Sequence, residues 1–549
     1  MAGSGFDTHE VFNQPPQFPV VNAIESDPVL IGSIDHALDK TSEAALNAHA
    51  AFWGSLEARE LARLAVQSPP RLSTHDAQGR RVDSVEHHHA YHALMRRSAE
   101  AGFGEPPPIQ AAPHLAHAEM LRAVRLFVTA QTEPGHLIAF AGSRAAGALL
   151  QGLGSHEVAP WLAGLTAKRY DNRALPVEQK AGITLTFGIT EKQGGVEPID
   201  TTTTAQPMAS GLHRLVGHKW FVSAPMSDAA IILAEAPGGP SAFLVPRLLA
   251  DGSVNAVRLQ RLKDTLGMRA MAIAEIELAD AEGLLLGGEG SGPALIGGAL
   301  EVMRFDATIV AAGQMRSALA HAVHHCRHRA VSGDRLVDLD LMTRVLADMT
   351  LDVAAATVLV MRLAAARDAA LTDPIEAAFF SLVLPAAKYW ITRTAVAVAS
   401  EALECVGGNG YVEAGLMPRF LRDAPANMIW AGPGNVLALD LLDMLLENPR
   451  RLDAVIEEFT GELGRNGSVS AEVIRAAANA CQDDRGSARI LTEQLALTAA
   501  AAALHRFAPR ALTDAFIDTR LSGPWRASYG MLDSRYDSRG IVDYAFHGL

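Results

Sequence analysis

Hydrophobic and polar residues change their spacing twice along the 549-residue chain. From about Ser33 to Lys168, alanine and leucine recur every three or four residues, which predicts that helices dominate this part. Between about Gly182 and Leu286, short apolar runs alternate with Gly- and Pro-rich turns, which predicts the strands of a small antiparallel barrel or sandwich. These runs begin at Ile183, Arg214, Ala230, Ser241 and Ala272.

Long helices are expected again after Gly290. One of them has a continuous apolar stripe, while Arg344, Asp348 and Asp352 lie on another face, as in a bundle helix. A last segment is alanine-rich and helical to about Pro509. The expected fold class is therefore α+β, multi-domain and mostly α. We expect an N-terminal helical domain, a middle β-barrel, a C-terminal helical bundle and a helical extension, over residues 1–181, 182–290, 291–445 and 446–549.

Composition excludes several classes of protein. Hydrophobic residues make up 49 % of the chain, which excludes intrinsic disorder. The 47 Lys and Arg residues against 61 Asp and Glu give a net charge of −14, which argues against a surface attracted as a whole to nucleic acid or anionic membrane. Cys326, Cys405 and Cys481 form no CxxC pair, and no uninterrupted apolar run is long enough to span a bilayer. We expect a cytoplasmic protein that does not enter a membrane.

Four segments combine glycine with hydroxyl, aromatic or charged residues, at 188–195 (GITEKQGG), 216–223 (VGHKWFVS), 406–411 (VGGNGY) and 429–435 (IWAGPGN). Glycines allow backbone amides to approach a planar ring or a phosphate, and hydroxyls can donate to its heteroatoms. Taken singly, the first segment is also consistent with a glycine-rich turn, and the second is more typical of a buried strand.

In this order the four segments resemble those of the flavin-dependent acyl-CoA dehydrogenase superfamily, and most closely its alkylation-response branch. Further matching stretches extend the resemblance nearly from end to end: THEVFNQP from Thr8, HDAQGRR from His75, RLKDTLGMR from Arg261 and MRFD from Met303. The resemblance implies the acyl-CoA dehydrogenase fold, in which a helical domain, a β-barrel and a four-helix bundle enclose FAD.

The resemblance also implies which residues bind the cofactor. Phe187, Ile189 and Thr190 would line the flavin ring, and Phe221, Val222 and Ser223 would cover its other side. Arg329 matches an arginine that reaches the FAD pyrophosphate of a neighbouring subunit, a task that suits its bidentate guanidinium. This role implies a homo-oligomer, a tetramer built as a dimer of dimers. The remaining implied cofactor residues are Gly195, Val196, Gly407, Gly408, Trp430, Gly432, Pro433 and Asn435.

The chain departs from the family at the catalytic base. Many members carry a glutamate where this chain has Ala431, and alanine cannot take a proton. In isovaleryl-CoA dehydrogenase-like members the base lies on another helix, at the position matched by Asp306. An acid there can equally be structural and pair with Arg304 or another cation. Val196 and Pro433 lack hydroxyls that other members offer to FAD phosphates, which implies weaker cofactor binding.

Two further features bear on partners. The histidines at 321, 324, 325 and 328 have the spacing of one helix face, but no acidic or cysteine ligand accompanies them, so we expect a polar subunit-facing surface and no metal. The alkylation-response branch implies DNA binding by the C-terminal region. Residues 440–549 contain 12 arginines, no lysine and 16 acidic residues, a net charge of −4, which makes DNA binding doubtful.

The expected function is therefore that of an FAD-dependent oxidoreductase, in which Asp306 removes a substrate proton and flavin N5 accepts hydride. The substrate is a small molecule, an acyl thioester or, since the usual base is missing, another compound; its electron acceptor is not identified. Two alternatives remain open: an alkylation-response flavoprotein that binds DNA with little dehydrogenase activity, and a flavin oxidase or monooxygenase of specialised metabolism.

Overall fold

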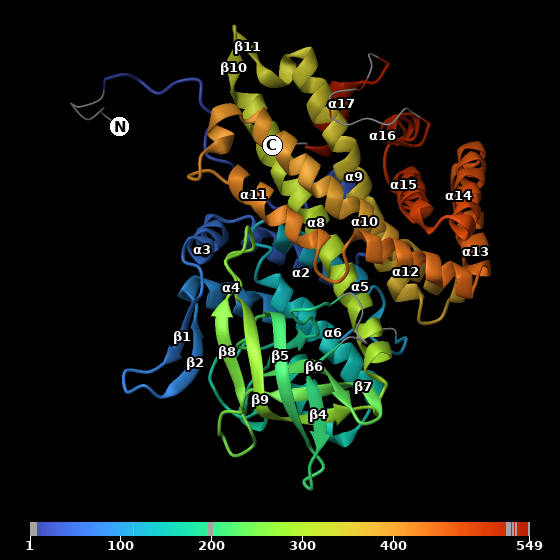
Figure 1. The fold of residues 1–549 in the computed structure, drawn as a ribbon. Coiled ribbons are helices and arrows are strands. Elements are labelled where there is room, and N and C mark those ends of the chain that lie inside the picture. The colour runs from blue at the N-terminus through green and yellow to red at the C-terminus, as the bar shows by residue number, and fades with distance from the viewer. Residues whose placement is uncertain are drawn as a thin grey trace.

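The computed structural model describes residues 8–112, 115–195, 201–522, 529, 532 and 535–546. Figure 1 shows helices above a β-domain, with a separate group of C-terminal helices at one side. This arrangement confirms the expected fold class. The N-terminal part consists of α1 (Pro28–Ile34), α2 (Lys40–Trp53), α3 (Leu56–Gln67), β1 (Arg71–His75), β2 (Arg81–Glu86), α4 (His89–Glu100), α5 (Ala118–Ala130), α6 (Leu137–Leu153) and α7 (Ala159–Thr166).

Helix starts in this part carry the expected capping residues. The carboxylates of Asp27 and Asp39 accept from backbone amides of the first turns of α1 and α2, and the Ser55 hydroxyl does the same for α3. The β1–β2 hairpin was not expected from the helical pattern. Its turn is held by Asp76, whose carboxylate accepts from the amides of Gln78 and Arg80.

The β-domain is a barrel-like sheet of seven strands. Its strands are β3 (Leu185–Gly188), β4 (Thr204–Pro207), β5 (His213–Ser223), β6 (Ala229–Ala236), β7 (Gly239–Pro246), β8 (Val257–Leu262) and β9 (Ile273–Leu286). The pairings β6–β7, β7–β9, β9–β5, β5–β4 and β4–β6 close a ring, and β8 adds to β9.

The sheet differs from the expected antiparallel arrangement. Both β3 and β4 pair with β6 in parallel, because the chain returns to β6 through a long crossover and not through a hairpin. The apolar pattern also missed β4 and β8. Each of these short strands has only one buried position, so neither carries an apolar run.

The remaining chain is helical. It consists of α8 (Gly292–His328), a small hairpin of β10 (Ala330–Val331) and β11 (Asp334–Arg335), α9 (Asp340–Ala369), α10 (Pro374–Cys405), a 3-10 turn η7 (Gly407–Tyr411), α11 (Met417–Asp423), α12 (Gly434–Glu447), α13 (Arg450–Leu463), α14 (Arg465–Asp483), α15 (Ala488–Phe507), α16 (Arg510–Phe516) and α17 (Ser538–Ala545).

Helix α9 lies at the centre of this helical part. By length and composition it is the one helix in the described ranges that could cross a membrane, but 94 % of its most apolar window is buried inside the molecule. The face carrying Asp348 and Asp352 is also buried, because Arg520 of the C-terminal extension binds both carboxylates, at 2.6 and 3.0 Å. The extension thus covers the polar side of a helix whose apolar side packs in the bundle.

Candidate flavin site

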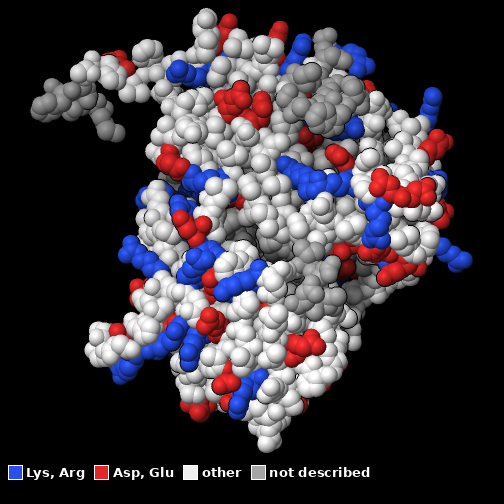
Figure 2. All heavy atoms as spheres, viewed as in Figure 1, with Lys and Arg blue, Asp and Glu red and all other residues white. Residues whose placement is uncertain are grey.

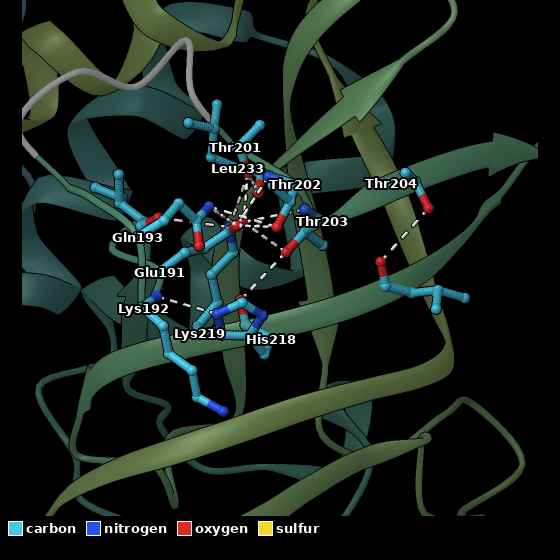
Figure 3. A network of polar contacts seen from close by, with 12 residues as sticks. Glu191, Lys192, Gln193, Thr201, Thr202, Thr203, Thr204, His218, Lys219 and Leu233 are labelled. Atoms are coloured by element: carbon cyan, nitrogen blue, oxygen red, sulfur yellow. Dashed lines mark hydrogen bonds and ion pairs between the residues drawn. The ribbon is translucent and has the colours of Figure 1, made fainter.

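A buried ion pair organises the turn that follows β3 (Figure 3). The Lys219 ammonium on β5 donates to Glu191 Oε1 at 2.5 Å, and both side chains are buried. The hydroxyls of Thr201 and Thr203 donate to the same oxygen, and the amide and hydroxyl of Thr202 donate to Oε2. One carboxylate therefore ties the turn to β5 and to the segment that enters β4.

The electrostatics of the pair follow from its burial. Burial by itself raises the pKa of Glu191, but the hydrogen bonds from Lys219 and the three threonines outweigh it and hold that pKa far below its ordinary value. Burial lowers the pKa of Lys219 to about 8, against the opposing effect of Glu191. Both groups are charged at neutral pH, so removing either one leaves an unpaired buried charge.

This network places Ile189 and Thr190 at the edge of the barrel. The Trp220 amide donates to the Thr190 carbonyl at 2.8 Å, and Lys219 Nζ lies 3.4 Å from the Ile189 carbonyl. Gly195 closes the turn against Thr190, since a Cβ at this position would lie 2.5 Å from the Thr190 hydroxyl. The flavin-lining residues implied by the resemblance thus have a rigid support.

The second strand of the site is the end of β5. Val222 points into the barrel core, whereas the neighbouring Phe221 is 51 % exposed. The Thr186 hydroxyl on β3 donates to the Ser223 carbonyl at 2.6 Å, which joins the two strands. Neither the Ser223 hydroxyl nor the Thr190 hydroxyl has a hydrogen-bond partner among the described residues.

The loop that holds the emptied base position is fixed by two cations. Lys388 of α10 donates to the carbonyls of Trp430 and Gly432, both at 2.9 Å, and Arg304 of α8 donates to the Ala431 carbonyl at 2.9 Å. Ala431 and Gly432 have φ angles of 57° and 111°. A left-handed conformation is strained for alanine, so the loop keeps its shape because three successive carbonyls are held.

Lys388 is fully buried without a carboxylate partner among the described residues. Burial, together with the charges of Arg304 and Arg393, lowers its pKa to about 7. Sequence reasoning missed this residue. A signal was present, because Lys388 is a single charge within the apolar run 382–391, where it could reach solvent only by breaking the packing.

The loop and the first β-segment meet in one apolar cluster. Trp430 and Ala431 pack against it together with Ile189, and Phe187 is one of its buried members. The Trp430 indole donates to Asn427 at 3.0 Å, which sets the orientation of the ring. Of the other implied residues on this loop, Pro433 is exposed, and the Asn435 side chain accepts from Arg489 at 2.8 Å.

Asp306 lies inside the helical part and is 2 % exposed. Its two oxygens accept from the Arg122 guanidinium of α5 at 2.6 and 2.7 Å, and Arg122 also donates to the Phe103 carbonyl at 3.0 Å. Burial by itself lowers the pKa of Arg122, but Asp306 and other nearby acids outweigh this effect. The pKa of Arg122 is therefore raised above its ordinary value. Arg304, the partner considered from sequence, instead pairs with Asp440 at 2.5 Å.

Three other implied cofactor residues, Arg329, Gly407 and Gly408, lie away from the barrel edge. Arg329 follows the last residue of α8 and donates to the Asn13 carbonyl at 2.6 Å, and Asn409 in the neighbouring turn donates to Gln14. A 37-residue helix is about 55 Å long, and the β-domain packs near its other end (Figure 1). Within one chain the implied cofactor residues therefore form two separate groups.

The first group fits a flavin. It presents two hydroxyls without partners, an exposed phenylalanine and the half-buried Ile189 and Trp430 around one edge of the barrel. The second group supplies backbone that a ligand can approach closely, since a Cβ added to Gly407 or Gly408 would meet nothing within 4 Å. Val196, a further implied cofactor residue, lies outside the described residues.

The four histidines of α8 do not form the expected polar subunit-facing surface. His324 and His325 are buried, and His321 stacks on Phe18 with ring centroids 4.0 Å apart. His324 contacts the Pro16 carbonyl at 3.0 Å. His321 and His324 face inward because the N-terminal segment covers this part of the helix, whereas His328 is exposed. Across the described ranges, no group of three or more potential ligands is arranged to hold a metal ion.

Two arginines near the end of the described chain are paired with acids. Arg520 is enclosed between two aspartates of α9, and Arg539 pairs with Asp338 at 2.5 Å and with Asp543 at 2.7 Å. In Figure 2, basic and acidic side chains are mixed over the C-terminal helices. A phosphate backbone requires a positive field, and these paired charges do not provide one.

Comparisons with known protein families agree with this architecture. The model of the adaptive response protein AidB N-terminal domain matches residues 13–172. The models of the acyl-CoA dehydrogenase middle and C-terminal domains match residues 186–281 and 290–446. Together these matches follow the order of the helical, β and helical parts.

Individual relatives cover nearly the whole chain. The putative acyl-CoA dehydrogenase AidB of Escherichia coli is 37 % identical over 94 % of this chain and 95 % of its own length. The structure of Caenorhabditis elegans ACDH-11 in complex with C11-CoA has a TM-score of 0.81 at 24 % identity and covers 96 % of this chain and 95 % of that chain. An acyl-CoA dehydrogenase complexed with FAD from Bacillus anthracis has a TM-score of 0.60 at 18 % identity, with 79 % and 78 % covered.

Proposed function

This chain belongs to the acyl-CoA dehydrogenase superfamily, and from that premise we propose that it is an FAD-dependent oxidoreductase acting on acyl-CoA thioesters or related compounds. The observation that carries the proposal is the edge of the barrel described above. There, the hydroxyls of Thr190 and Ser223 have no hydrogen-bond partner among the described residues, and Ile189 and Trp430 pack against one apolar cluster. FAD bound there would supply the acceptor for hydride.

The protein residues position and enclose the reacting groups. The Glu191–Lys219 pair fixes the turn carrying Ile189 and Thr190, and Lys388 with Arg304 fixes the loop carrying Trp430. Because these supports are buried and rigid, the site needs little reorganisation when a ligand enters. In this proposal the Ser223 hydroxyl would donate to the flavin nitrogen that accepts hydride.

Asp306 is the proposed base. An ionised carboxylate has about four lone-pair sites, and Arg122 occupies only two of those on Asp306. A substrate proton can therefore be taken on the side of the carboxylate that faces away from the guanidinium. Arg122 keeps a positive charge beside the carboxylate and fixes its orientation.

We further propose that the cofactor is shared between subunits of a homotetramer in the cytoplasm. The loop of the first group lies beside Met303 and Arg304 of α8, whereas Arg329 follows the last residue of this helix, about 38 Å further along its axis. The pyrophosphate contact of Arg329 is therefore made to the flavin of a neighbouring copy. The three cysteines, all buried as free thiols, are compatible with a reducing compartment.

The test is an anaerobic titration of the flavin-loaded protein with a panel of acyl-CoAs that includes isovaleryl-CoA. Bleaching of the visible flavin spectrum is expected. The Asp306→Asn variant should retain FAD and lose the bleaching rate by a factor of about 100 or more, the usual effect of a catalytic base. Glu301→Gln, on the same helix and paired with Arg367, is the matched control. Unchanged bleaching in Asp306→Asn would remove this residue from the mechanism.

A further inference from the structure

The segment before α1 lies along the last turns of α8 and reaches the second group of implied cofactor residues. Phe18 stacks on His321 with ring centroids 4.0 Å apart, and the His324 ring contacts the Pro16 carbonyl at 3.0 Å. Asn13 lies beyond the last residue of the helix and contacts the hairpin that follows it. The segment therefore runs antiparallel to α8. Figure 1 shows it in blue, at the end of the molecule that carries β10 and β11.

The Asn13 side chain caps the outer edge of this hairpin. Its amide nitrogen donates to the Ala330 carbonyl at 2.8 Å, and its amide oxygen accepts from the Ala330 amide at 2.7 Å. Because the Leu336 amide donates to the Arg329 carbonyl across the hairpin, the next pair, Ala330 and Arg335, has its backbone groups directed outward. One side chain thus takes the place of a neighbouring strand at this edge.

The backbone of Asn13 also holds the Arg329 guanidinium. The Asn13 carbonyl accepts from Arg329 at 2.6 Å. Asn13 has a φ of 52°, a left-handed conformation that asparagine adopts more readily than most residues, and in it the carbonyl reaches Arg329 while the side chain reaches Ala330. Arg329 forms no ion pair with any described residue and uses one of its N–H donors in this contact. The guanidinium is therefore held in place while its charge and its other donors remain for an anion.

The next residue connects this site to the glycine turn after α10. The Asn409 amide in η7 donates to the Gln14 side-chain oxygen at 3.3 Å. In the same turn the backbone of Gly407 and Gly408 is open to a ligand, since a Cβ at either position would meet nothing within 4 Å. Arg329 and this turn follow two different helices, α8 and α10. Two adjacent N-terminal residues thus join the two elements that carry the implied cofactor contacts.

We propose that Asn13 and Gln14 are positioning residues for the cofactor, which hold Arg329 and the glycine turn together for the pyrophosphate of a neighbouring copy's FAD. This inference rests on the proposed function, in which copies of the chain share FAD. An arginine side chain has many rotamers, and fixing it before the ligand arrives lowers the entropy that binding costs. The N-terminal segment thus contributes to FAD affinity through Arg329.

Dilution of the flavin-loaded protein tests the inference, because released FAD gives a rise in flavin fluorescence from which its dissociation constant follows. Asn13→Ala should raise that constant by about fivefold, since two hydrogen bonds to Ala330 are lost. The double variant Asn13→Ala/Arg329→Met should bind FAD no more weakly than Arg329→Met alone, because Asn13 acts through that arginine. Asn466→Ala, an exposed change on α14, is the matched control and should bind FAD like the wild type.

The outcomes separate this inference from the proposed function. Wild-type affinity for FAD in Asn13→Ala overturns the inference. It is equally overturned if the losses of the two single variants multiply in the double variant, since Asn13 then acts independently of Arg329. Wild-type affinity in Arg329→Met contradicts the sharing of the cofactor itself. A wild-type protein that binds no FAD contradicts the proposed function as a whole.

Discussion

Two buried lysines show how single residues support the flavin edge. Lys219 has a carboxylate partner in Glu191, whereas Lys388 binds only carbonyl oxygens. Both hold backbone segments in place, and the loop held by Lys388 includes alanine in a left-handed conformation. The different pairing of the two lysines leads to different predictions for stability.

Lys388 should make stability depend on pH. Its folded pKa of about 7 is below the ordinary value of 10.5, so between these values the unfolded chain binds more protons and stability rises with pH. The unfolding free energy of the wild type relative to Lys388→Met should increase by about 1.4 kcal/mol per pH unit between about pH 8 and about pH 9.5. Urea unfolding at each pH measures this free energy. Lys40→Met, a change at an exposed lysine, should have the same pH dependence of the unfolding free energy as the wild type. If Lys388→Met also has that pH dependence, the lowered pKa of Lys388 is contradicted.

Glu191 should be needed for both stability and flavin retention. Glu191→Gln leaves the Lys219 ammonium buried without a carboxylate, which costs about 3–5 kcal/mol. The turn carrying Ile189 and Thr190 then loses its support, so the flavin-to-protein absorbance ratio should fall. Glu235→Gln, an exposed change on β6, serves as the control. Full flavin content in Glu191→Gln would show that the network does not support the site.

Among the elements, α9 illustrates how one helix serves two neighbours. Its apolar stripe packs in the bundle, and its polar face receives Arg520 of the C-terminal extension. Without the extension, the carboxylates of Asp348 and Asp352 would lose the guanidinium that covers them. The extension is therefore packed against the bundle by an ion pair as well as by apolar contacts.

Arg520→Met should loosen this extension. Two aspartates would remain buried without a cation, a loss of about 3–5 kcal/mol, so segment 446–549 should become more susceptible to limited proteolysis than the bundle. Mass spectrometry of the fragments locates the cleavage sites. Arg510→Met, an exposed change in the same extension, should digest like the wild type. Equal digestion of all three proteins would mean that the extension is held by other contacts.

At the scale of the whole molecule, the net charge bears on DNA as a partner, and the length of α8 bears on a neighbouring copy of the chain as a partner. The net charge of −14 and the pairing of Arg520 and Arg539 with acids argue against DNA as a partner. The length of α8 separates the two groups of cofactor residues. If copies of the chain share the cofactor, as proposed, flavin retention depends on the oligomer.

Arg329→Met should lower the flavin content without unfolding the chain. The variant lacks the guanidinium proposed to contact the pyrophosphate of a neighbouring copy, and among the described residues this guanidinium donates only to the Asn13 carbonyl. Size-exclusion chromatography with detection at the protein and flavin bands measures oligomer and cofactor together. Arg335→Met, on β11 of the same hairpin, is the control. Unchanged flavin content in Arg329→Met would contradict cofactor sharing.

The order of helical, β and helical parts was predictable from the sequence, because periodicity records which face of an element is buried. Five of the seven barrel strands were found in this way, whereas β4 and β8 were missed because each buries one residue. The site residues on the first β-segments were implied by the resemblance of their glycine-containing segments to the acyl-CoA dehydrogenase superfamily. Lys388, which holds the 430–432 loop, and Arg122, which holds Asp306, were both missed, although the apolar run around Lys388 carried a signal.

The sequence by itself determined the fold class, the loss of the glutamate at Ala431 and the acidic balance, since each depends on residue identity or spacing. Only the tertiary structure decided which groups meet: Asp306 with Arg122 instead of Arg304, Arg520 with two aspartates of α9, and His321 and His324 with the N-terminal segment. The physical reason is that an ion pair or a buried ring depends on packing between elements distant in sequence, which local periodicity does not record.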